Sequence, residues 1–394
     1  MKTILDFDFS NKTALIRVDF NVPLDSNLEV IDNTRILSAK PTILKVLKDG
    51  GSCVLMSHLG RPKGIQANLS LGNIVSEIEK ALERKITFVP DCIGVETENI
   101  VNSIKPGEII LLENLRFYSE ETDGNEGFAE KLSKLGQVYV NDAFGAAHRK
   151  HSSTAVITKF FDNKKYLGLL LHKEVNAIER VLKTGKKPVI AVLGGAKVSS
   201  KITIINNILG KVDEIILGGG MAYTFIKAKG GEIGNSICEN DKLDLALEVI
   251  RKAKANNVTL HLPTDVIAAD DFSNSANAKE LNIFNIPKGW QGLDIGPNSR
   301  KSFAQAIINA KTILWNGPMG VFEMTAFENG TKAVGEAIKI ATQKGAFSLV
   351  GGGDSVSAVK KFGLAYDVSY VSTGGGAMLE SLEGKTLPGI AALQ

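Results

Sequence analysis

The sequence predicts an α/β protein with two doubly wound parallel-sheet lobes, joined by a helix and separated by a cleft. Three observations support this fold class. Short apolar runs alternate with amphipathic helical patterns, a long helical pattern lies near the middle of the chain, and polar or glycine-rich clusters follow almost every apolar run. Continuous apolar runs are typical of strands buried on both faces of a parallel sheet. A chain of 394 residues also has room for two cores.

The first lobe is expected to contain five strands. They correspond to the runs TALIRVDF (13–20), SCVLMSHL (52–59), ITFVP (86–90), EIILLENLRF (108–117) and VYVNDAF (138–144). A helical pattern from Ser70 to Arg84 follows the second run, with Ser70 as its N-cap. Because alternating strands and helices form right-handed crossover units, these strands should pair in parallel in a Rossmann-like sheet.

A helical pattern from Leu171 to Lys183 separates the two halves of the chain. Val175, Ile178 and Val181 lie on one face of this helix, and the residues TGKKP that follow end it. We therefore expect a first lobe over 1–170, a joining helix over 171–186 and a second lobe over 187–376. A helical connector lets two lobes swing as rigid bodies, whereas a Gly/Ser-rich linker would let them wander.

The second lobe is expected to contain six strands. They correspond to the runs PVIAVLGG (188–195), EIILGGG (214–220), VTLHLPTD (258–265), TILWNGP (312–318), FSLVGGG (347–353) and VSYVSTGGG (368–376). Helical patterns run from Asp241 to Asn256 and from Asn329 to Lys344. The alternation again predicts a doubly wound parallel sheet.

Composition excludes several classes of protein. The chain has 46 basic and 43 acidic residues, a net charge of +3, which argues against general binding of nucleic acid or membrane surfaces. Cys53, Cys92 and Cys238 are far apart and form no C-x-x-C pair, so neither a disulfide framework nor a zinc site is expected. Asp6 and Asp8 interrupt the N-terminal segment where a signal peptide would be apolar. We expect a cytoplasmic protein with free thiols.

The strand ends of the first lobe are rich in arginine, which is otherwise scarce in this chain. Five arginines follow a strand or begin a helix, and three histidines accompany them: Arg17, Arg35, Arg61, Arg116 and Arg149, with His58, His148 and His151. Guanidinium groups bind carboxylate and phosphate through two hydrogen bonds at once, so the set predicts a site for a small polyanion. Taken singly, each arginine could equally be a surface residue. Asp19 and Asn21 would bind a ligand hydroxyl or orient Arg35, or simply form a turn.

The strand ends of the second lobe are rich in glycine. Five clusters occur, at GGAKVSSK (194–201), GGG (218–220), NGPMGVFE (316–323), GGGDS (351–355) and STGGG (372–376). Glycine lets the backbone approach a ligand, and N–H groups at helix starts attract phosphate, so this lobe is predicted to bind a nucleotide. The chain has neither a G-x-x-x-x-G-K-[ST] loop nor a complete G-x-G-x-x-G after a strand. A Walker-type ATPase and a standard dehydrogenase are therefore disfavoured.

Four charged residues near these clusters are candidates for phosphate chemistry. If a helix starts near Val198, Lys197 and Lys201 lie on one face of it. Their two ammonium groups would then either follow the charge of a phosphoryl group as it moves between donor and acceptor, or simply form a solvated helix face. Asp354 would hold a nucleotide-bound Mg²⁺ or act as an ordinary N-cap. Glu323 would accept from ribose hydroxyls or lie on the surface. A polyanion lobe and a nucleotide lobe together predict direct in-line phosphoryl transfer across a closing cleft.

The chain resembles phosphoglycerate kinase over essentially its whole length. The strings that carry the resemblance are LIRVDFNVP (15–23), SHLGRP (57–62), LLENLRF (111–117), NDAFGAAHR (141–149), LGGAKVSSK (193–201), GGGMAYTF (218–225), LPTD (262–265), LDIGP (293–297), WNGPMGVFE (315–323), GGGDS (351–355) and STGGGAMLE (372–380). The resemblance implies reversible transfer of the acyl phosphate of 1,3-bisphosphoglycerate to Mg-ADP. Such an enzyme is a phosphotransferase with a carboxyl acceptor. Met319 and Met378 depart from the family pattern, but both stand beside glycine turns.

The resemblance also implies roles for individual residues. Those that contact the phosphoglycerate would be Asp19, Phe20, Asn21, Arg35, His58, Leu59, Gly60, Arg61, Arg116 and Arg149. Those that bind the nucleotide would be Lys201, Gly292, Glu323, Gly352, Gly353, Asp354 and Ser355, with Asp354 near the Mg²⁺. Those that stabilise the transferring group would be Arg35, Lys197, Lys201 and the amides around Gly374 and Gly375.

The resemblance further implies that residues 377–394 return to the first lobe, and that the protein is a hinge-bending monomer with no nucleic-acid or membrane partner. Two other functions stay open. One is a non-catalytic nucleotide-binding or scaffold protein on this fold, and the other is a kinase for a different small carboxylate. An assay with 3-phosphoglycerate and competing carboxylates separates these alternatives.

Overall fold

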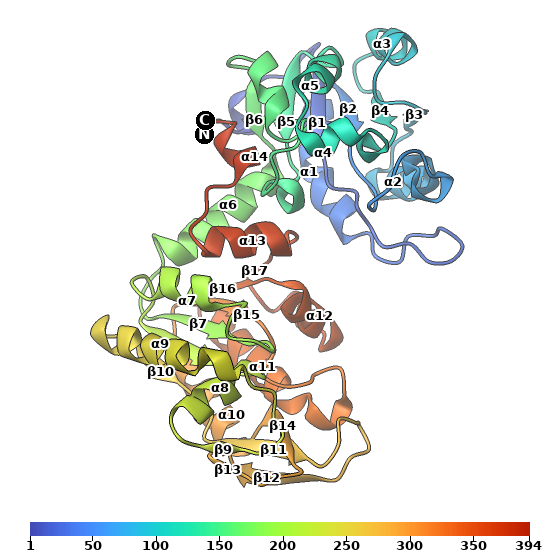
Figure 1. The fold of residues 1–394 in the computed structure, drawn as a ribbon. Coiled ribbons are helices and arrows are strands. Elements are labelled where there is room, and N and C mark those ends of the chain that lie inside the picture. The colour runs from blue at the N-terminus through green and yellow to red at the C-terminus, as the bar shows by residue number, and fades with distance from the viewer. The chain divides into compact units, whose positions relative to one another are not determined.

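The computed structural model describes all 394 residues and divides into two compact units (Figure 1). The first unit comprises residues 1–176 and 386–394, and the second comprises residues 177–385. The chain passes from one to the other within α6 (Leu169–Leu182), the helix expected to join them.

The segment that returns to the first unit is shorter than the sequence suggested. It begins at Thr386 rather than at residue 377. Helix α13 (Gly375–Leu382) belongs to the second unit, where it packs against α7 (Ile202–Ile208). The Asn207 side-chain amide donates to the Leu382 carbonyl at 2.7 Å, which fixes the end of α13 in that unit.

The first unit contains a six-stranded parallel sheet with the order β3-β4-β2-β1-β5-β6, confirming the predicted fold class. Its strands are β1 (Thr13–Arg17), β2 (Ser52–Met56), β3 (Thr87–Val89), β4 (Ile109–Leu112), β5 (Val138–Asn141) and β6 (Lys165–Leu167). The five predicted strands are all present. The sixth, β6, was not predicted because it is three residues long and follows a charged stretch.

The helices of the first unit connect these strands. Besides the first turns of α6, they are α1 (Thr34–Lys48), α2 (Val75–Leu82), α3 (Val95–Asn102), α4 (Ser119–Asp123), α5 (Glu126–Ser133) and α14 (Pro388–Ala391). The helix predicted from Ser70 begins as a 3-10 turn and continues as α2, and the Ser70 hydroxyl accepts from the Gly72 amide as a cap. Helix α14 lies in the returning segment, so both chain termini lie together in this unit (Figure 1).

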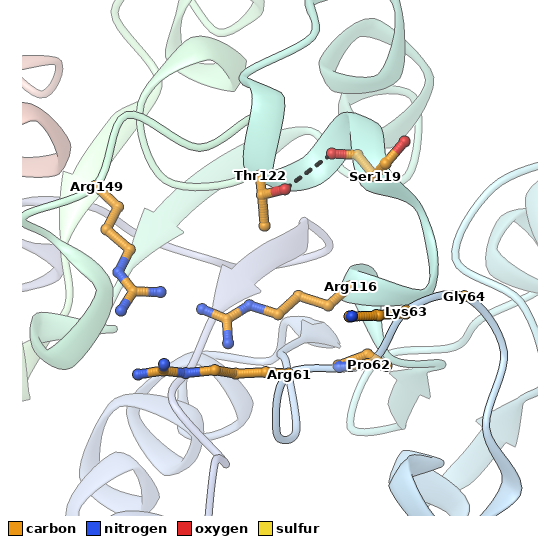
Figure 2. Close-up of a pocket in the computed structure, with 8 residues that line it drawn as sticks. All are labelled: Arg61, Pro62, Lys63, Gly64, Arg116, Ser119, Thr122 and Arg149. Atoms are coloured by element: carbon orange, nitrogen blue, oxygen red, sulfur yellow. Dashed lines mark hydrogen bonds between the residues drawn. The ribbon is translucent and has the colours of Figure 1, made fainter.

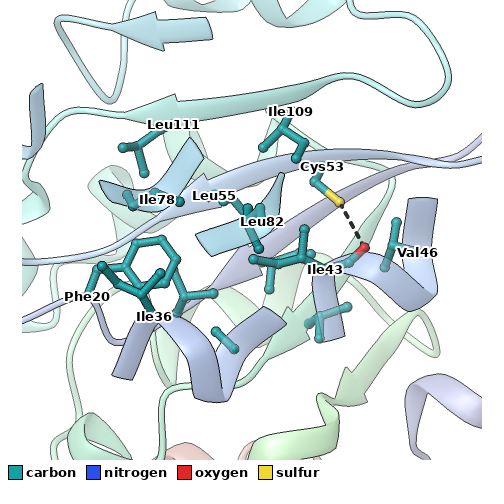
Figure 3. Packing of buried hydrophobic residues seen from close by; sticks show 14 of the residues in the cluster. Phe20, Ile36, Ile43, Val46, Cys53, Leu55, Ile78, Leu82, Ile109 and Leu111 are labelled. Carbon is teal, nitrogen blue, oxygen red and sulfur yellow. Dashed lines mark hydrogen bonds between the residues drawn. The ribbon is translucent and has the colours of Figure 1, made fainter. Parts of the chain in front are cut away.

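The core of the first unit lies between the sheet and its helices (Figure 3). Strands β1 and β2 contribute Ile16, Cys53 and Leu55, and α1 contributes Ile36 and Ile43, all fully buried. The Cys53 thiol contacts the Ile43 carbonyl at 3.9 Å, so this cysteine is a small core residue. Truncating a buried isoleucine or leucine of this core to alanine typically costs about 2–5 kcal/mol, and the sheet is therefore a rigid base for the loops at its edge.

The second unit contains a second six-stranded parallel sheet, with the order β10-β8-β7-β15-β16-β17. Its strands are the six predicted ones: β7 (Val189–Leu193), β8 (Glu214–Leu217), β10 (Thr259–His261), β15 (Thr312–Asn316), β16 (Phe347–Val350) and β17 (Tyr370–Val371). Besides α7 and α13, its helices are α8 (Met221–Ala228), α9 (Leu243–Ala255), α10 (Pro297–Asn309), α11 (Asn329–Gln343) and α12 (Gly353–Lys361). None of the protein's helices combines the length and apolar character that crossing a membrane requires.

The second unit also contains two small sheets that were not predicted. One is antiparallel, with the order β12-β11-β14, and the other pairs β9 with β13. Their strands are β9 (Glu232–Ile233), β11 (Asp265–Ala269), β12 (Ala278–Asn282), β13 (Asn285–Ile286) and β14 (Gln291–Ile295). Strand β14 carries Gly292, so this addition helps to build the candidate site.

Candidate functional site

The first unit has a cavity of about 550 Å³ in which three arginines converge (Figure 2). Arg61 follows β2, Arg116 lies in the 3-10 turn after β4, and Arg149 follows β5, so three loops at one sheet edge supply one guanidinium each. The remaining lining is Pro62, Lys63, Gly64, Ser119 and Thr122. No carboxylate lines the cavity, so the arrangement favours an anion.

Arg116 is held with part of its hydrogen-bonding capacity unused. Its Nη1 donates to the Gly60 carbonyl at 2.6 Å, while its buried Nε has no partner. Burial, followed by the nearby charges of Arg17 and Arg149, lowers the pKa of Arg116 to about 10. The guanidinium therefore remains charged at neutral pH.

Asp19, Asn21 and Arg35 form a second group beside this cavity. Arg35 donates through Nη1 to Asp19 Oδ1 at 3.1 Å and to the Asn21 carbonyl at 3.0 Å. The Asn21 side-chain oxygen accepts from the Gly60 amide at 2.8 Å. Asp19 therefore orients Arg35, which is one of the three roles that the sequence left open. The other N–H groups of the Arg35 guanidinium are not used in these two bonds.

Arg17 is the clearest failure of the sequence prediction in this lobe. It ends β1 as expected but is fully buried, so the prediction that it lines the anion crevice is wrong. Its Nε donates to Ser153 Oγ at 2.8 Å, its Nη2 lies 3.1 Å from His58 Nδ1, and its Nη1 donates to the Val18 carbonyl. Arg17 thus helps to hold Ser153 and His58 in place and does not face the cavity.

Two of the three histidines, His58 and His151, add no positive charge to the site. Burial, followed by the charge of Arg17, lowers the pKa of His58 well below its usual value. The same causes lower the pKa of His151 to about 3. His148 lies next to Arg149, whose Nε is 3.1 Å from its Nε2. The buried imidazoles of His58 and His151 are therefore neutral at physiological pH, and the positive charge that lines the cavity belongs to Arg61, Arg116, Arg149 and Lys63.

Phe20 and Leu59 place their side chains in the core. The Phe20 amide donates to Ser57 Oγ at 2.8 Å, and the Leu59 amide donates to Asn114 Oδ1 at 3.2 Å. Any contact that these two residues make with a ligand must therefore come from their backbone.

The second unit has a cavity of about 450 Å³ built largely from glycines and apolar side chains. Predicted residues Gly292, Glu323 and Asp354 line it. The other lining residues are Gly195, Ala196, Gly219, Gly220, Tyr223, Ile237, Phe272, Gln291, Leu293, Pro318, Met319, Gly320 and Val321. An apolar wall with a few polar groups is the usual character of a small-molecule site.

Two glycines of this site bring separate loops into direct contact. A Cβ on Gly194 would lie 1.9 Å from the Pro318 carbonyl oxygen, and one on Gly317 would lie 2.1 Å from the Gly194 oxygen. Gly317 also has a φ of +113°, which favours glycine. The loops after β7 and β15 can meet this closely only because neither position has a side chain.

Lys201 reaches from its loop to Asn316, at the end of β15. Its ammonium group donates to Asn316 Oδ1, and Asn316 Nδ2 in turn donates to the Gly351 carbonyl at 2.6 Å. Burial lowers the pKa of Lys201, while Asp354 acts in the opposite direction. The sequence analysis did not single out Asn316, although its position after a buried strand was a usable signal.

The prediction that Lys197 and Lys201 share a helix face is wrong. Helix α7 begins at Ile202, with Lys201 as its N-cap, and not near Val198. The preceding residues form a turn in which Lys197 is exposed. The Glu239 carboxylate accepts hydrogen bonds from the amide and the hydroxyl of Ser199, at 2.9 and 2.5 Å. These bonds stabilise the turn and so oppose a helix that would begin before Ile202.

The N-termini of α12 and α13 lie next to each other. Helix α12 begins after Gly352, and a Cβ on Gly375, the first residue of α13, would lie 3.6 Å from Gly353 N. Two helix starts in contact concentrate N–H groups and positive dipole ends, which suits phosphate. The Ser355 hydroxyl accepts from the Gly317 amide at 2.6 Å, so it is already used to position the neighbouring loop.

The donor set suits a divalent cation that arrives with a phosphate ligand. The protein has no group of three or more His, Cys, Asp or Glu side chains able to enclose a metal. Asp354 is an exposed carboxylate in the first turn of α12 that lines the cavity. Mg²⁺ in nucleotide sites commonly takes one or two carboxylates together with substrate phosphates and water, so Asp354 fits such an ion.

Comparisons with known proteins agree on one family. The family model described as phosphoglycerate kinase matches residues 4–385. The phosphoglycerate kinase of Porphyromonas gingivalis is 51% identical over the full length of both chains. The cytosolic phosphoglycerate kinase of Triticum aestivum is 48% identical over 99% of this chain and 97% of its own. The structure of phosphoglycerate kinase from Coxiella burnetii superposes with a TM-score of 0.92 at 41% identity, covering 99% of this chain and 98% of that one.

Proposed function

The chain belongs to the phosphoglycerate kinase family, and from this premise we propose where its two substrates bind and how the transfer proceeds. It is a glycolytic phosphotransferase that moves the acyl phosphate of 1,3-bisphosphoglycerate to ADP, reversibly giving ATP and 3-phosphoglycerate. The proposal rests on one observation. Each unit carries its own cavity, one lined by arginines without a carboxylate and the other by glycines and apolar groups.

The phosphoglycerate binds to the first unit. Its non-transferring phosphate, the group with the highest charge, enters the cavity of Arg61, Arg116 and Arg149, where three guanidiniums can pair with it. Its reacting carboxyl end lies toward Arg35, which Asp19 and the Asn21 carbonyl orient. The glycerate part of the substrate contacts the loop of His58, Leu59 and Gly60, in which the Leu59 and Gly60 amides already donate to Asn114 and Asn21.

The nucleotide binds to the second unit. Its base lies against the apolar wall of the cavity, near Ile237, Leu293 and Val321, and its ribose hydroxyls donate to Glu323. Its phosphates extend toward Lys201 and the start of α12, where Gly352, Gly353 and the Ser355 amide provide N–H groups. Asp354 would hold Mg²⁺, which neutralises phosphate charge and helps to orient the chain of phosphates.

The transfer is a direct in-line displacement. A carboxylate oxygen of 3-phosphoglycerate attacks the terminal phosphorus of ATP, and the bond from that phosphorus to the ADP oxygen breaks, with no proton transferred. Arg35, Lys197, Lys201 and the amides around Gly374 and Gly375 surround the moving phosphoryl group and offset its charge. Because these groups come from both units, we infer that a hinge motion brings them together and excludes water. We further propose that the enzyme acts as a monomer in the cytoplasm.

A coupled assay tests this function. Turnover of ATP with 3-phosphoglycerate should require both substrates and a divalent cation, and EDTA should abolish it. Glycerate and acetate, which have the carboxyl but lack the phosphate, should be poor acceptors. Absence of turnover at millimolar substrates would favour a non-catalytic nucleotide-binding protein. Equal rates with another small carboxylate would favour a different carboxylate kinase.

A further inference from the structure

A buried carboxylate lies beneath the arginine cavity and has no part in the mechanism above. Glu121 is in α4 and is fully buried. Its Oε2 accepts from the Ser153 amide at 2.9 Å, and its Oε1 accepts from the Ser153 hydroxyl at 2.6 Å. The same Oε1 lies 3.7 Å from His151 Nδ1. A fully buried carboxylate is costly to retain unless an opposite charge and hydrogen bonds compensate it.

The opposite charge is that of Arg17. Its Nε donates to the Ser153 hydroxyl at 2.8 Å, and that hydroxyl donates to Glu121. Ser153 is itself held by Tyr139, whose hydroxyl donates to the Ser153 carbonyl at 2.7 Å. One serine hydroxyl thus joins a buried guanidinium to a buried carboxylate, and the two charges offset each other below the cavity.

This network touches each segment that carries a cavity arginine. Glu121 lies five residues after Arg116 on the same segment. Ser153 is next to Thr154, whose hydroxyl donates to the Arg149 carbonyl at 2.9 Å. Arg17 contacts His58, three residues before Arg61. The network of Glu121, Ser153 and Arg17 therefore has contacts with all three segments.

We propose that Glu121 is a positioning residue for phosphoglycerate binding. It sets the spacing of Arg61, Arg116 and Arg149, and it offsets the buried charge of Arg17, which would otherwise add to the repulsion among these cations before the substrate arrives. This inference rests on the proposed binding of the substrate's phosphate in the arginine cavity. Loss of the carboxylate should weaken phosphoglycerate binding and leave nucleotide binding unaffected, since the nucleotide cavity is built from other residues.

The test compares Glu121→Gln with Glu120→Gln, its exposed neighbour, as the matched control. Steady-state assays on the full-length enzyme give kcat and both KM values, and calorimetry gives the affinity for 3-phosphoglycerate. We expect Glu121→Gln to raise the KM for 3-phosphoglycerate at least ten-fold, while the KM for ATP stays within two-fold. Glu120→Gln should leave kcat, both KM values and the affinity for 3-phosphoglycerate unchanged. An unchanged KM for 3-phosphoglycerate, or an equal rise in both KM values, would overturn the proposal.

Two further variants test the charge and the serine link. Glu121→Asp keeps the charge on a shorter side chain and should recover part of the lost affinity. If it binds 3-phosphoglycerate less well than Glu121→Gln, the counter-charge role is wrong. Ser153→Ala removes only the bridging hydroxyl and should raise the KM for 3-phosphoglycerate at least three-fold. If the Glu121 variants do not fold, Ser153→Ala takes their place in the test. An unchanged KM for 3-phosphoglycerate in Ser153→Ala would then overturn the proposal.

Arg149→Gln separates this inference from the proposed function. If Arg149→Gln weakens 3-phosphoglycerate binding and Glu121→Gln does not, only the positioning role of Glu121 is wrong. If Arg149→Gln also leaves binding unchanged, the substrate's phosphate does not bind in the arginine cavity, and the proposed binding mode is wrong as well.

Discussion

Asp142, at the end of β5, shows how a single residue can link the fold to pH. Its Oδ1 accepts from the amides of Leu170 and Leu171, at 2.9 and 3.1 Å, and so fixes the start of α6. Its Oδ2 is buried without a partner. Burial raises the pKa of Asp142 to about 6, although hydrogen bonds from Thr42 and α6 oppose this shift. The folded protein therefore binds this proton more tightly than the unfolded chain does.

The raised pKa predicts that Asp142 destabilises the fold as pH increases. The unfolded carboxyl ionises near pH 4, so the favourable contribution of the protonated group is complete below that pH. This contribution is lost as the pH rises from about 4 to about 6. The difference between the pKa of Asp142 in the unfolded and in the folded protein corresponds to about 3 kcal/mol of stability. Asp142→Asn removes this dependence. The melting temperature of the variant relative to the wild type should rise by several degrees between pH 4.5 and 7.5, and a constant difference would contradict the prediction.

Lys201 is the residue at which loss of charge should affect chemistry most. Its ammonium group already contacts Asn316 and lies near Asp354, on the nucleotide side of the site. We expect Lys201→Ala to lower kcat by roughly 10²–10³-fold, as removal of one donor to transferring charge typically does. The affinity for 3-phosphoglycerate, measured by calorimetry, should change by less than three-fold. Lys254→Ala, an exposed lysine of α9, is the control. Near-normal turnover in Lys201→Ala would contradict the proposed role.

At the scale of elements, the loops after β7 and β15 depend on glycine for their contact. Gly317→Ala would place a Cβ 2.1 Å from the Gly194 oxygen at a φ of +113°, and backbone cannot yield as a flexible side chain can. We expect the variant to raise the KM for ATP at least ten-fold and to destabilise the second unit by about 2–4 kcal/mol. Gly210→Ala is the control, because a Cβ there meets nothing within 4 Å. Wild-type values for Gly317→Ala would show that the loops can separate without loss of function.

The sequence predicted the sheets well because buried parallel strands are continuous apolar runs. Eleven of the twelve strands in the two large sheets lie within such predicted runs. Strand β12 was not predicted because it is an exposed antiparallel strand, AKELN, with one partly buried leucine. Short or exposed strands owe their conformation to pairing with neighbours, which local patterns do not reveal.

The candidate sites were predicted less evenly, for a related reason. Residue type and position after a strand were sufficient to predict that Arg61, Arg116 and Arg149 gather around one cavity. The same signal failed for Arg17, which has the same sequence setting but is buried, because a single sequence does not show which neighbours cover a side chain. The start of α7 was also misplaced, since Glu239, 40 residues away from Ser199, holds the preceding turn.

For the whole molecule, the proposal that the two substrates bind to different units predicts that catalysis depends on domain motion. In the proposed binding mode the phosphoglycerate groups belong to the first unit and the nucleotide groups to the second, and one phosphoryl group must contact both sets during transfer. When only one substrate is bound, it contacts the groups of one unit and forms no contact that joins the two units. We therefore expect the change in shape to require both substrates together.

Small-angle scattering tests this expectation directly. With 3-phosphoglycerate and a non-hydrolysable ATP analogue with Mg²⁺ both present, the radius of gyration should fall by on the order of 1 Å, toward the roughly 21 Å of a compact chain of this length. Either ligand alone should produce a smaller change. Arg149→Gln should need higher 3-phosphoglycerate concentrations for the same contraction, because it weakens the bridging ligand rather than the hinge. An identical radius with and without both ligands would mean that the transferring groups meet without domain closure, and the hinge would then have no role in excluding water.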